Sequence, residues 1–116
     1  MKFSPALLVW LLVAGCAGRG NREVRVYLGE NGTAQYIRPK TIIADPGEFL
    51  TFVIKNEGFE EHNFFSKPLR IDLIVLLPNE SATVSFQAPG RAGSYGFVCD
   101  MPDHEQQGMY GELIVP

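Results

Sequence analysis

Hydrophobic alternation over short runs is the feature that most limits what this chain can fold into. In the run Phe49–Lys55, the side chains of Leu50, Phe52 and Ile54 share one face, as a half-buried strand requires. Turn signals such as Asp45-Pro46-Gly47-Glu48, directly before this run, and Asn31-Gly32, earlier in the chain, separate the short runs from one another. Repeated short strands joined by Gly and Pro turns predict an all-β fold, a Greek-key β-sandwich or barrel of six to eight strands.

The remaining strands are expected where branched and aromatic residues gather. Segment 68–78 ends in a continuous apolar run, so its period does not separate a strand from a buried helix. Its bounding prolines favour irregular structure plus a strand. Residues 56–59 are expected to open a loop that carries His62. The other expected strands are 23–28, 36–37, 41–44, 79–88, 93–98 and 110–115.

The N-terminal residues have the composition of a targeting segment. The apolar run 6–14 is shorter than the about 20 residues that a membrane-spanning helix needs, so residues 1–15 are interpreted as a signal peptide. Residues 12–16 resemble a bacterial lipobox, which predicts lipid on Cys16, a tether over 16–22 and one folded domain over 23–116. The alternative is ordinary cleavage that removes Cys16.

Lipidation of Cys16 would determine where the protein resides. Two or more acyl chains hold a protein stably on a membrane, whereas one holds it only marginally. The expected location is therefore the outer face of the cytoplasmic membrane, or the outer membrane facing the periplasm. In an oxidising compartment a free Cys99 would be at risk, and a metal-bound one is easier to rationalise.

Four side chains near the C-terminal half form a candidate metal site. Cys99, His104 and Met109 stand at equal intervals in a turn-rich loop, and His62 lies upstream. Singly, a free Cys or a Met is ordinary core filler, but the chain has only two His and both belong to this set. Two His, one Cys and one Met form the ligand set that selects copper in an electron-transfer site. Zinc could bind the same residues, although a structural zinc site is more usually closed by Cys or His than by Met.

The pattern Cys-x4-His-x4-Met over 99–109, followed by Gly111-Glu-Leu-Ile-Val115 and preceded by His62-Asn63, resembles the cupredoxins. These are the small blue copper proteins of the plastocyanin and azurin superfamily. Residues 36–58 also resemble the N-terminal half of that family, so the resemblance covers about 23–116. The gap between the Cys and the second His is longer than in plastocyanin and closer to rusticyanin-like and sulfocyanin-like members.

The resemblance implies a single Cu(I)/Cu(II) ion in a type 1 site. His62, Cys99 and His104 would form a near-planar triad, with Met109 as the axial ligand. It also implies a hydrogen bond between Asn63 and the residue after the Cys, where this chain has Asp and many relatives have Ser or Thr. The electron port would be the edge of the second imidazole, among the neighbouring loop residues Met101 and Pro102.

The function expected on this basis is one-electron transfer between extracytoplasmic redox proteins, such as a c-type cytochrome or a terminal oxidase. The protein would act as a monomer and would not be an enzyme. Catalytic relatives need further His clusters, and this chain has no third His. The alternative is delivery of copper to an oxidase, which would favour an exposed site rich in Met or His; Met101 is the one spare thioether nearby.

The acidic residues are unevenly distributed in a chain of formal net charge −3. Segments 56–66 and 92–116 contain acids but no Lys or Arg, which argues against a nucleic-acid partner. Either these acids form a solvated rim or they dock a basic partner, and the sequence leaves both interpretations open. They are Glu57, Glu60, Glu61, Asp100, Asp103, Glu105 and Glu112.

Overall fold

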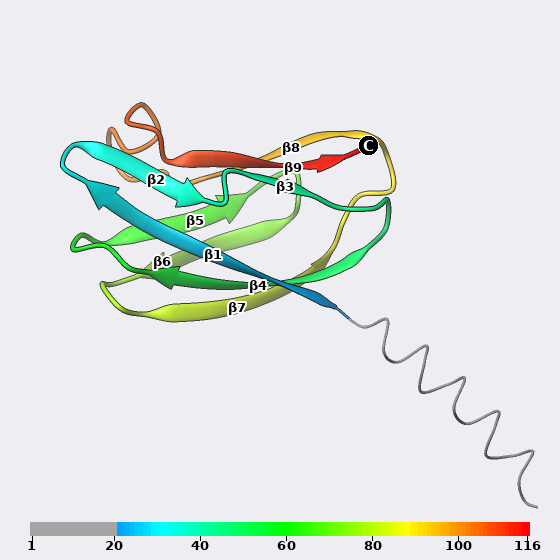
Figure 1. Cartoon of the computed structure of the whole chain (residues 1–116), viewed down its shortest axis with the longest axis horizontal. Helices are drawn as coiled ribbons and strands as arrows, with labels where there is room; N and C mark the ends of the chain where they lie inside the picture. Colours follow the sequence, from blue (N-terminus) through cyan, green and yellow to red (C-terminus); the bar gives the residue numbers. More distant parts are fainter. Residues whose placement is uncertain (1–20) are drawn as a thin grey trace, which may run out of the picture.

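The computed structural model describes residues 21–116, which form nine strands in two sheets (Figure 1). One sheet has the order β2-β1-β4-β7 and the other the order β3-β9-β8-β5-β6. The strands are β1 Arg22–Asn31, β2 Ala34–Arg38, β3 Thr41–Ile43, β4 Phe49–Asn56, β5 His62–Ser66, β6 Ile71–Leu76, β7 Ser81–Gln87, β8 Gly93–Val98 and β9 Tyr110–Val115.

The all-β prediction is confirmed. The predicted signal segment 1–15 and Cys16 lie outside the described residues, as does most of the predicted tether. Within residues 21–116, no helix has the length and apolar composition needed to cross a membrane.

One strand exceeds the expected number because His62 opens β5 instead of lying inside a loop. Sequence reasoning missed this strand because its residues include His62, Asn63 and Ser66, which hide the apolar pattern. These polar side chains are nevertheless buried, and the Ser66 hydroxyl donates a hydrogen bond to the Gly96 carbonyl at 2.6 Å. Satisfied polar groups can occupy a sheet interior without the cost of an unpaired one.

Aromatic rings join the two sheets. Phe52 of β4 makes edge-to-face contacts with Phe64 of β5 and Phe97 of β8, at centroid distances of 6.2 and 6.3 Å. Phe86 of β7 lies 4.8 Å from the same ring. All of these rings except the partly buried Phe86 are inaccessible to solvent, so the cluster fixes the spacing between the two sheets, of which the five-stranded one carries the candidate ligands.

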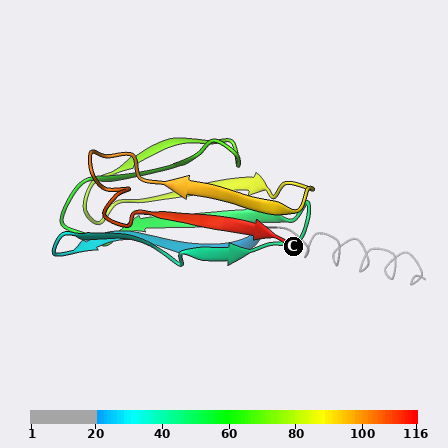
Figure 2. The same cartoon turned by 90° about the horizontal axis from the view of Figure 1, so that it is seen from above.

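The strand directions bring the candidate ligands to one end of the sandwich. β1 and β4 are parallel, and both end near the start of β5. β8 and β9 are antiparallel, with Val98 opposite Tyr110, and run side by side in Figure 2. The loop between β8 and β9 therefore lies at this end, whereas the chain enters β1 at the other (Figure 1).

Gly111 of β9 leaves room for two close neighbours, the Phe97 ring of β8 and the backbone of Lys40 just before β3. A Cβ at this position would collide with the Phe97 ring and would lie 2.6 Å from the Lys40 carbonyl oxygen. Gly96 of the neighbouring strand has room, because a Cβ there would meet only the Gly111 carbonyl oxygen at 3.7 Å.

We expect Gly111→Ala to lower the free energy of unfolding by about 1–3 kcal/mol, the usual effect of overpacking a closed interior. Gly96→Ala should change it by less than about 1 kcal/mol, since its added methyl makes an ordinary contact. Urea denaturation followed by far-UV circular dichroism measures the free energy of unfolding of both variants. Equal losses for the two variants would contradict this account of Gly111.

Candidate metal centre

The pairing of β8 with β9 brings the two ends of the loop 99–109 together. Cys99 follows the last residue of β8, and Met109 precedes the first residue of β9. The Cys99 amide donates to the Met109 carbonyl oxygen at 3.1 Å. Both side chains are fully buried. The sequence spacing of Cys99 and Met109 thus becomes spatial adjacency through strand register.

His104 lies at the centre of the hydrogen bonds inside this loop. Its carbonyl oxygen accepts from the amides of Gln107 and Met109 at 3.1 and 2.9 Å. Its own amide donates to the Met101 carbonyl oxygen at 3.0 Å. A turn stabilised in this way holds the imidazole at a fixed position between the two strand ends.

The loop is also attached to β2 and to the residues that follow it. The Gln35 amide donates to the Gln107 carbonyl oxygen at 2.9 Å, and Lys40 Nζ donates to the Gly108 carbonyl oxygen at 3.3 Å. Gly108 has φ +110°, and a Cβ there would lie 2.8 Å from the Gln35 carbonyl oxygen. Only glycine satisfies both the backbone conformation and this close approach.

The structure brings three of the four predicted ligands into one cluster. Donor atoms of His62, Cys99 and His104 all lie within 4.8 Å of one another. Cys99 Sγ lies 3.5 Å from His104 Nδ1, and the two imidazole centroids are 5.1 Å apart. His62 is fully buried and His104 is 9% exposed. Met109 is also fully buried, and its carbonyl oxygen accepts the hydrogen bond from the Cys99 amide.

Both imidazoles point their Nε2 atoms toward carboxylates. His62 Nε2 lies 2.7 Å from Glu30 Oε1, and His104 Nε2 lies 3.3 Å from Glu60 Oε1. A carboxylate accepts a hydrogen bond, so we assign the ring proton of His62 to Nε2, which leaves a lone pair on Nδ1. His62 Nδ1 is buried and has no hydrogen-bond partner.

That unpartnered nitrogen is a physical sign that the cluster fits a metal ion. An unsatisfied buried acceptor costs roughly 1–3 kcal/mol, and native proteins seldom leave one without a reason. A metal at the centre of the cluster would use the lone pair. One thiolate and two neutral imidazoles, with a thioether nearby, suit copper better than magnesium or calcium, which prefer oxygen ligands.

Opposing effects set the charge of Glu30. Burial by itself would raise the pKa of its carboxyl group, but the amides of Phe59 and Glu60 and the His62 imidazole lower it. The net result is a pKa below the ordinary value for glutamate. Glu30 is therefore ionised at neutral pH although its side chain is only 6% exposed.

Reciprocal hydrogen bonds join the two segments that carry the ligands. Asn63 Nδ2 donates to Asp100 Oδ1 at 2.7 Å, and the Asp100 amide donates back to Asn63 Oδ1 at 2.8 Å. The Asn63 amide also lies 3.4 Å from Cys99 Sγ, in position to donate to the sulfur. The hydrogen bond expected from the family resemblance is thus present, and Asp accepts it as well as Ser or Thr would.

Asn56, at the end of β4, organises the loop that leads to His62. Its side-chain amide donates to the carbonyl oxygens of Glu60 and Leu76 at 2.8 and 2.9 Å, and its Oδ1 accepts from the Gly58 amide at 2.8 Å. Asn56 is fully buried. One side chain therefore fixes both ends of the short loop and the strand beside it.

Sequence reasoning missed Glu30 and Asn56. The signal for Glu30 was its place in the alternation of β1, because Val24, Val26 and Leu28 face inward and Glu30 continues the same face. A carboxylate on the inward face of a strand needs a hydrogen-bond donor, but nothing in the sequence indicates that the donor to Glu30 is His62. Asn56 offered no comparable signal, since Asn is common at strand ends.

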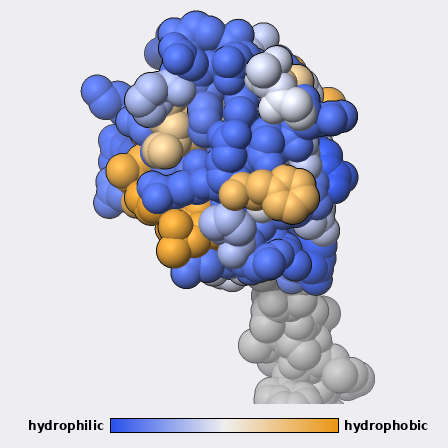
Figure 3. Space-filling model, turned by 90° about the vertical axis from the view of Figure 1, so that its left-hand side faces the viewer, coloured by the Kyte–Doolittle hydropathy of each residue, from blue (hydrophilic) through white to orange (hydrophobic). Residues whose placement is uncertain are grey.

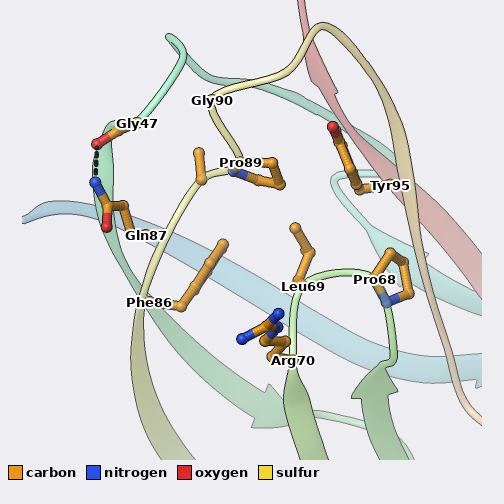
Figure 4. A pocket seen from close by; sticks show the side chains of 10 residues that line it. Gly47, Pro68, Leu69, Arg70, Phe86, Gln87, Pro89, Gly90 and Tyr95 are labelled. Carbon is orange, nitrogen blue, oxygen red and sulfur yellow. Dashed lines mark hydrogen bonds between the residues drawn. The ribbon is translucent and has the colours of Figure 1, made fainter.

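A hollow of ≈ 630 Å³ lies at the opposite end of the sandwich from the cluster (Figure 4). Arg70 is the one charged side chain that lines it, and Gln87 Nε2 donates to the Gly47 carbonyl oxygen at its rim at 3.1 Å. Its lining contains no His, Cys, Asp or Glu, and the hydroxyl of its Tyr95 donates a hydrogen bond to the Arg91 carbonyl oxygen at 2.6 Å.

Comparison with known proteins gives a family and a set of structural neighbours. A family model described as a cupredoxin-like domain matches residues 5–115. Dithionite-reduced auracyanin from the photosynthetic bacterium Roseiflexus castenholzii is 22% identical, with a TM-score of 0.68 over 84% of this chain and 98% of that one. Auracyanin A of Chloroflexus aurantiacus, described as a "blue" copper protein, is 21% identical, with a TM-score of 0.62 over 82% and 100%.

Longer enzymes contain the same fold. The copper-containing nitrite reductase of Thermus scotoductus is 16% identical, with a TM-score of 0.70 over 90% of this chain but 33% of the reductase. The chain thus spans a third of that enzyme's length. At these identities the likeness shows a shared fold alone. A search of curated protein sequences finds no match.

The buried thiol of Cys99 yields a test that needs no redox partner. Burial raises the pKa of Cys99, Asp100 raises it further, and the amides of Asn63 and Met101 offset only part of the increase. In the metal-free protein the thiol should therefore stay protonated at pH 7 and react slowly with iodoacetamide. The rate should rise as the pH passes above the ordinary thiol range.

This measurement uses a chain that begins at residue 17, so that Cys99 is its one thiol. One equivalent of Zn²⁺, which is redox-inert, should protect the thiol, and unfolding in urea should expose it. Reaction at pH 7 as fast in the folded as in the unfolded chain would contradict the raised pKa.

Proposed function

The chain belongs to the cupredoxin-like domain family, and on that premise we propose that it is a mononuclear blue copper protein that carries single electrons between extracytoplasmic redox partners. The observation that carries the proposal is the buried cluster of His62, Cys99 and His104, with its unpartnered His62 Nδ1. The auracyanin neighbours, among them a "blue" copper protein, support the same reading.

Four residues would hold the ion. Cys99 would bind as a thiolate, His62 and His104 through Nδ1, and the Met109 thioether would be a weak further ligand. When bound, copper supplies a couple that gains and loses one electron. The protein's part is to keep the donor atoms in place, which the loop, strand and Asn63–Asp100 hydrogen bonds favour.

Burial favours electron transfer over copper delivery. Delivery requires that ligands open and release the ion, yet His62, Cys99 and Met109 are fully buried. An electron needs only a short path to the surface, and His104 at 9% exposure reaches it. Within residues 21–116 there is one group of metal-binding side chains of this kind, whereas a copper oxidase or reductase needs further copper sites.

We place the partner at the end of the molecule that bears the His104 edge. That surface is largely hydrophilic in Figure 3, with separate hydrophobic groups. Glu60, Glu61, Asp103 and Glu105 are exposed there, and Glu60 lies against His104. An acidic rim of this kind suits a basic partner such as a c-type cytochrome, because complementary charge speeds encounter.

We also propose that lipid on Cys16 anchors this carrier, as a monomer, outside the cytoplasmic membrane. Mass spectrometry of the native N-terminus tests the anchor. An unmodified N-terminus located after Cys16 would reject it.

Copper(II) titration of a soluble form that begins at residue 17 tests the proposed function. The protein should turn intensely blue at one equivalent, because the Cys99 thiolate donates charge to the metal. Cys99→Ser should bind without the colour. Met109→Leu should remain blue with a raised reduction potential, since a weak axial ligand adjusts the site and does not create it. A colourless parent protein, or a blue Cys99→Ser variant, would reject the assignment.

The acidic rim predicts a salt-dependent rate of electron transfer. Stopped-flow mixing with a basic c-type cytochrome should give a rate that falls as salt rises, because screening shortens the reach of charge to about 8 Å at 0.15 M. Replacing Glu61 and Glu105 by Gln should lower the low-salt rate several-fold and flatten its salt dependence.

The matched control replaces Asp45 and Asp72 by Asn, because these exposed acids lie at the other end of the sandwich. This control removes the same charge and should leave the rate nearly unchanged. If both double variants behave alike, net charge and not the rim governs encounter. A parent rate indifferent to salt would also reject the docking role.

A further inference from the structure

Glu30 is a nearly buried carboxylate whose two oxygens have different partners. Oε1 lies 2.7 Å from His62 Nε2, and Oε2 accepts a hydrogen bond from the Phe59 amide at 2.6 Å. The side chain is only 6% exposed. Burying a charge is costly unless several hydrogen bonds compensate, so such a residue needs a reason to be where it is.

The surrounding backbone is shaped to admit this carboxylate. Gly58 faces it so closely that an added Cβ would collide with the Glu30 side chain. The Asn56 side chain holds both ends of the same loop through the Gly58 amide and the Glu60 carbonyl oxygen. The carboxylate, the loop and the His62 ring therefore form one hydrogen-bonded unit, anchored to β1 and β4.

We propose that Glu30 is a positioning residue for His62, which orients the imidazole with Nδ1 toward Cys99 and His104 and places a negative charge one ring away from the bound ion. The inference rests on the proposed copper site. It adds that this chain tunes the site through an acid drawn from the end of β1, a strand that contributes no ligand.

Two effects follow from the same hydrogen bond. By accepting a hydrogen bond from Nε2–H, the Glu30 carboxylate fixes the tautomer of His62 and makes Nδ1 a stronger electron-pair donor, which strengthens metal binding. A fixed negative charge in a poorly solvated position also stabilises Cu(II) more than Cu(I), since the oxidised ion carries the larger charge. Both effects favour the oxidised protein, so Glu30 should lower the reduction potential.

The second imidazole has a weaker version of this arrangement. Glu60 lies 3.3 Å from His104 Nε2, and its side chain is 51% exposed. Water screens an exposed charge far more than a buried one. The two imidazoles are therefore held unequally. The charge that acts on the site is the Glu30 carboxylate, which lies beside the buried His62.

The test compares Glu30→Gln with Glu57→Gln, using the chain that begins at residue 17. Gln has the shape of Glu but cannot accept from both the His62 ring and the Phe59 amide, because one of its two polar atoms is an NH₂ group. Glu57 is the matched control: it lies in the same loop, and its carboxylate bonds Tyr36 and Arg38 instead of a candidate ligand.

For Glu30→Gln, competitive titration should give a roughly 10–100-fold loss of Cu(II) affinity, the usual effect of removing a partner from a metal-bound His. Each tenfold loss that falls on Cu(II) alone raises the reduction potential by about 59 mV. Glu57→Gln should change the affinity less than about threefold. Voltammetry of the two variants reads the potential directly.

A second measurement uses the metal-free protein. Nitrogen-15 NMR of the parent should find His62 as the tautomer protonated at Nε2, with a slowly exchanging ring proton; Glu30→Gln should lose that protection. Gly58→Ala should disturb the same hydrogen bond between Glu30 and His62, because the added methyl displaces the Glu30 carboxylate without removing its charge. It should shift the tautomer and the potential in the same direction, and it decides the matter if Glu30→Gln fails to fold.

Equal potentials in the Glu30→Gln and Glu57→Gln proteins, or an unchanged His62 tautomer in Glu30→Gln, would overturn the proposal. A parent protein that forms no blue site would instead reject the proposed function. In that case the NMR measurement still decides whether Glu30 positions His62, so the two failures are distinguishable.

Discussion

The reciprocal hydrogen bonds between Asn63 and Asp100 join the two parts of the chain on which the site depends. His62 opens a strand of one hairpin, whereas Cys99, His104 and Met109 belong to the loop between β8 and β9. The pair of bonds, at 2.7 and 2.8 Å, fixes the first segment against the second. An electron-transfer site benefits from such fixity, because ligands that need not move between oxidation states add little to the barrier.

Around that junction the protein uses polar residues inside an otherwise apolar sandwich. Asn56, His62 and Asn63 are buried, and all three take part in hydrogen bonds close to the site. Ring packing among Phe52, Phe64 and Phe97 stabilises the sandwich immediately behind them. The aromatic core therefore sets the distance between sheets, and the polar layer sets the direction in which each ligand points.

The fold could be predicted because hydrophobic alternation and turn residues are local patterns, whereas His62 was grouped with Cys99 and His104 through their shared ligand chemistry and the resemblance to the cupredoxins. Strands 93–98 and 110–115 were expected with the bounds observed, since alternation and turn residues are readable along the chain. His62, Cys99 and His104 do meet, whereas the role of these three residues and of Met109 as metal ligands stays a prediction. Glu30 and the strand β5 were missed because their meaning depends on contacts between distant residues. No local pattern reports that residue 30 will lie beside residue 62.

The direction of β1 has a consequence for how the molecule meets its surroundings. The strand begins with Arg22 at one pole of the sandwich and ends beside Glu30 and the ligand cluster at the other. Any attachment made before Arg22 therefore holds the protein by the pole farthest from the His104 edge. Rotation about such a point would turn the edge through a wide range of directions without hiding it. If the proposed carrier is held in this way, it would exchange electrons with successive partners by reorientation and would not need to detach from its support between them.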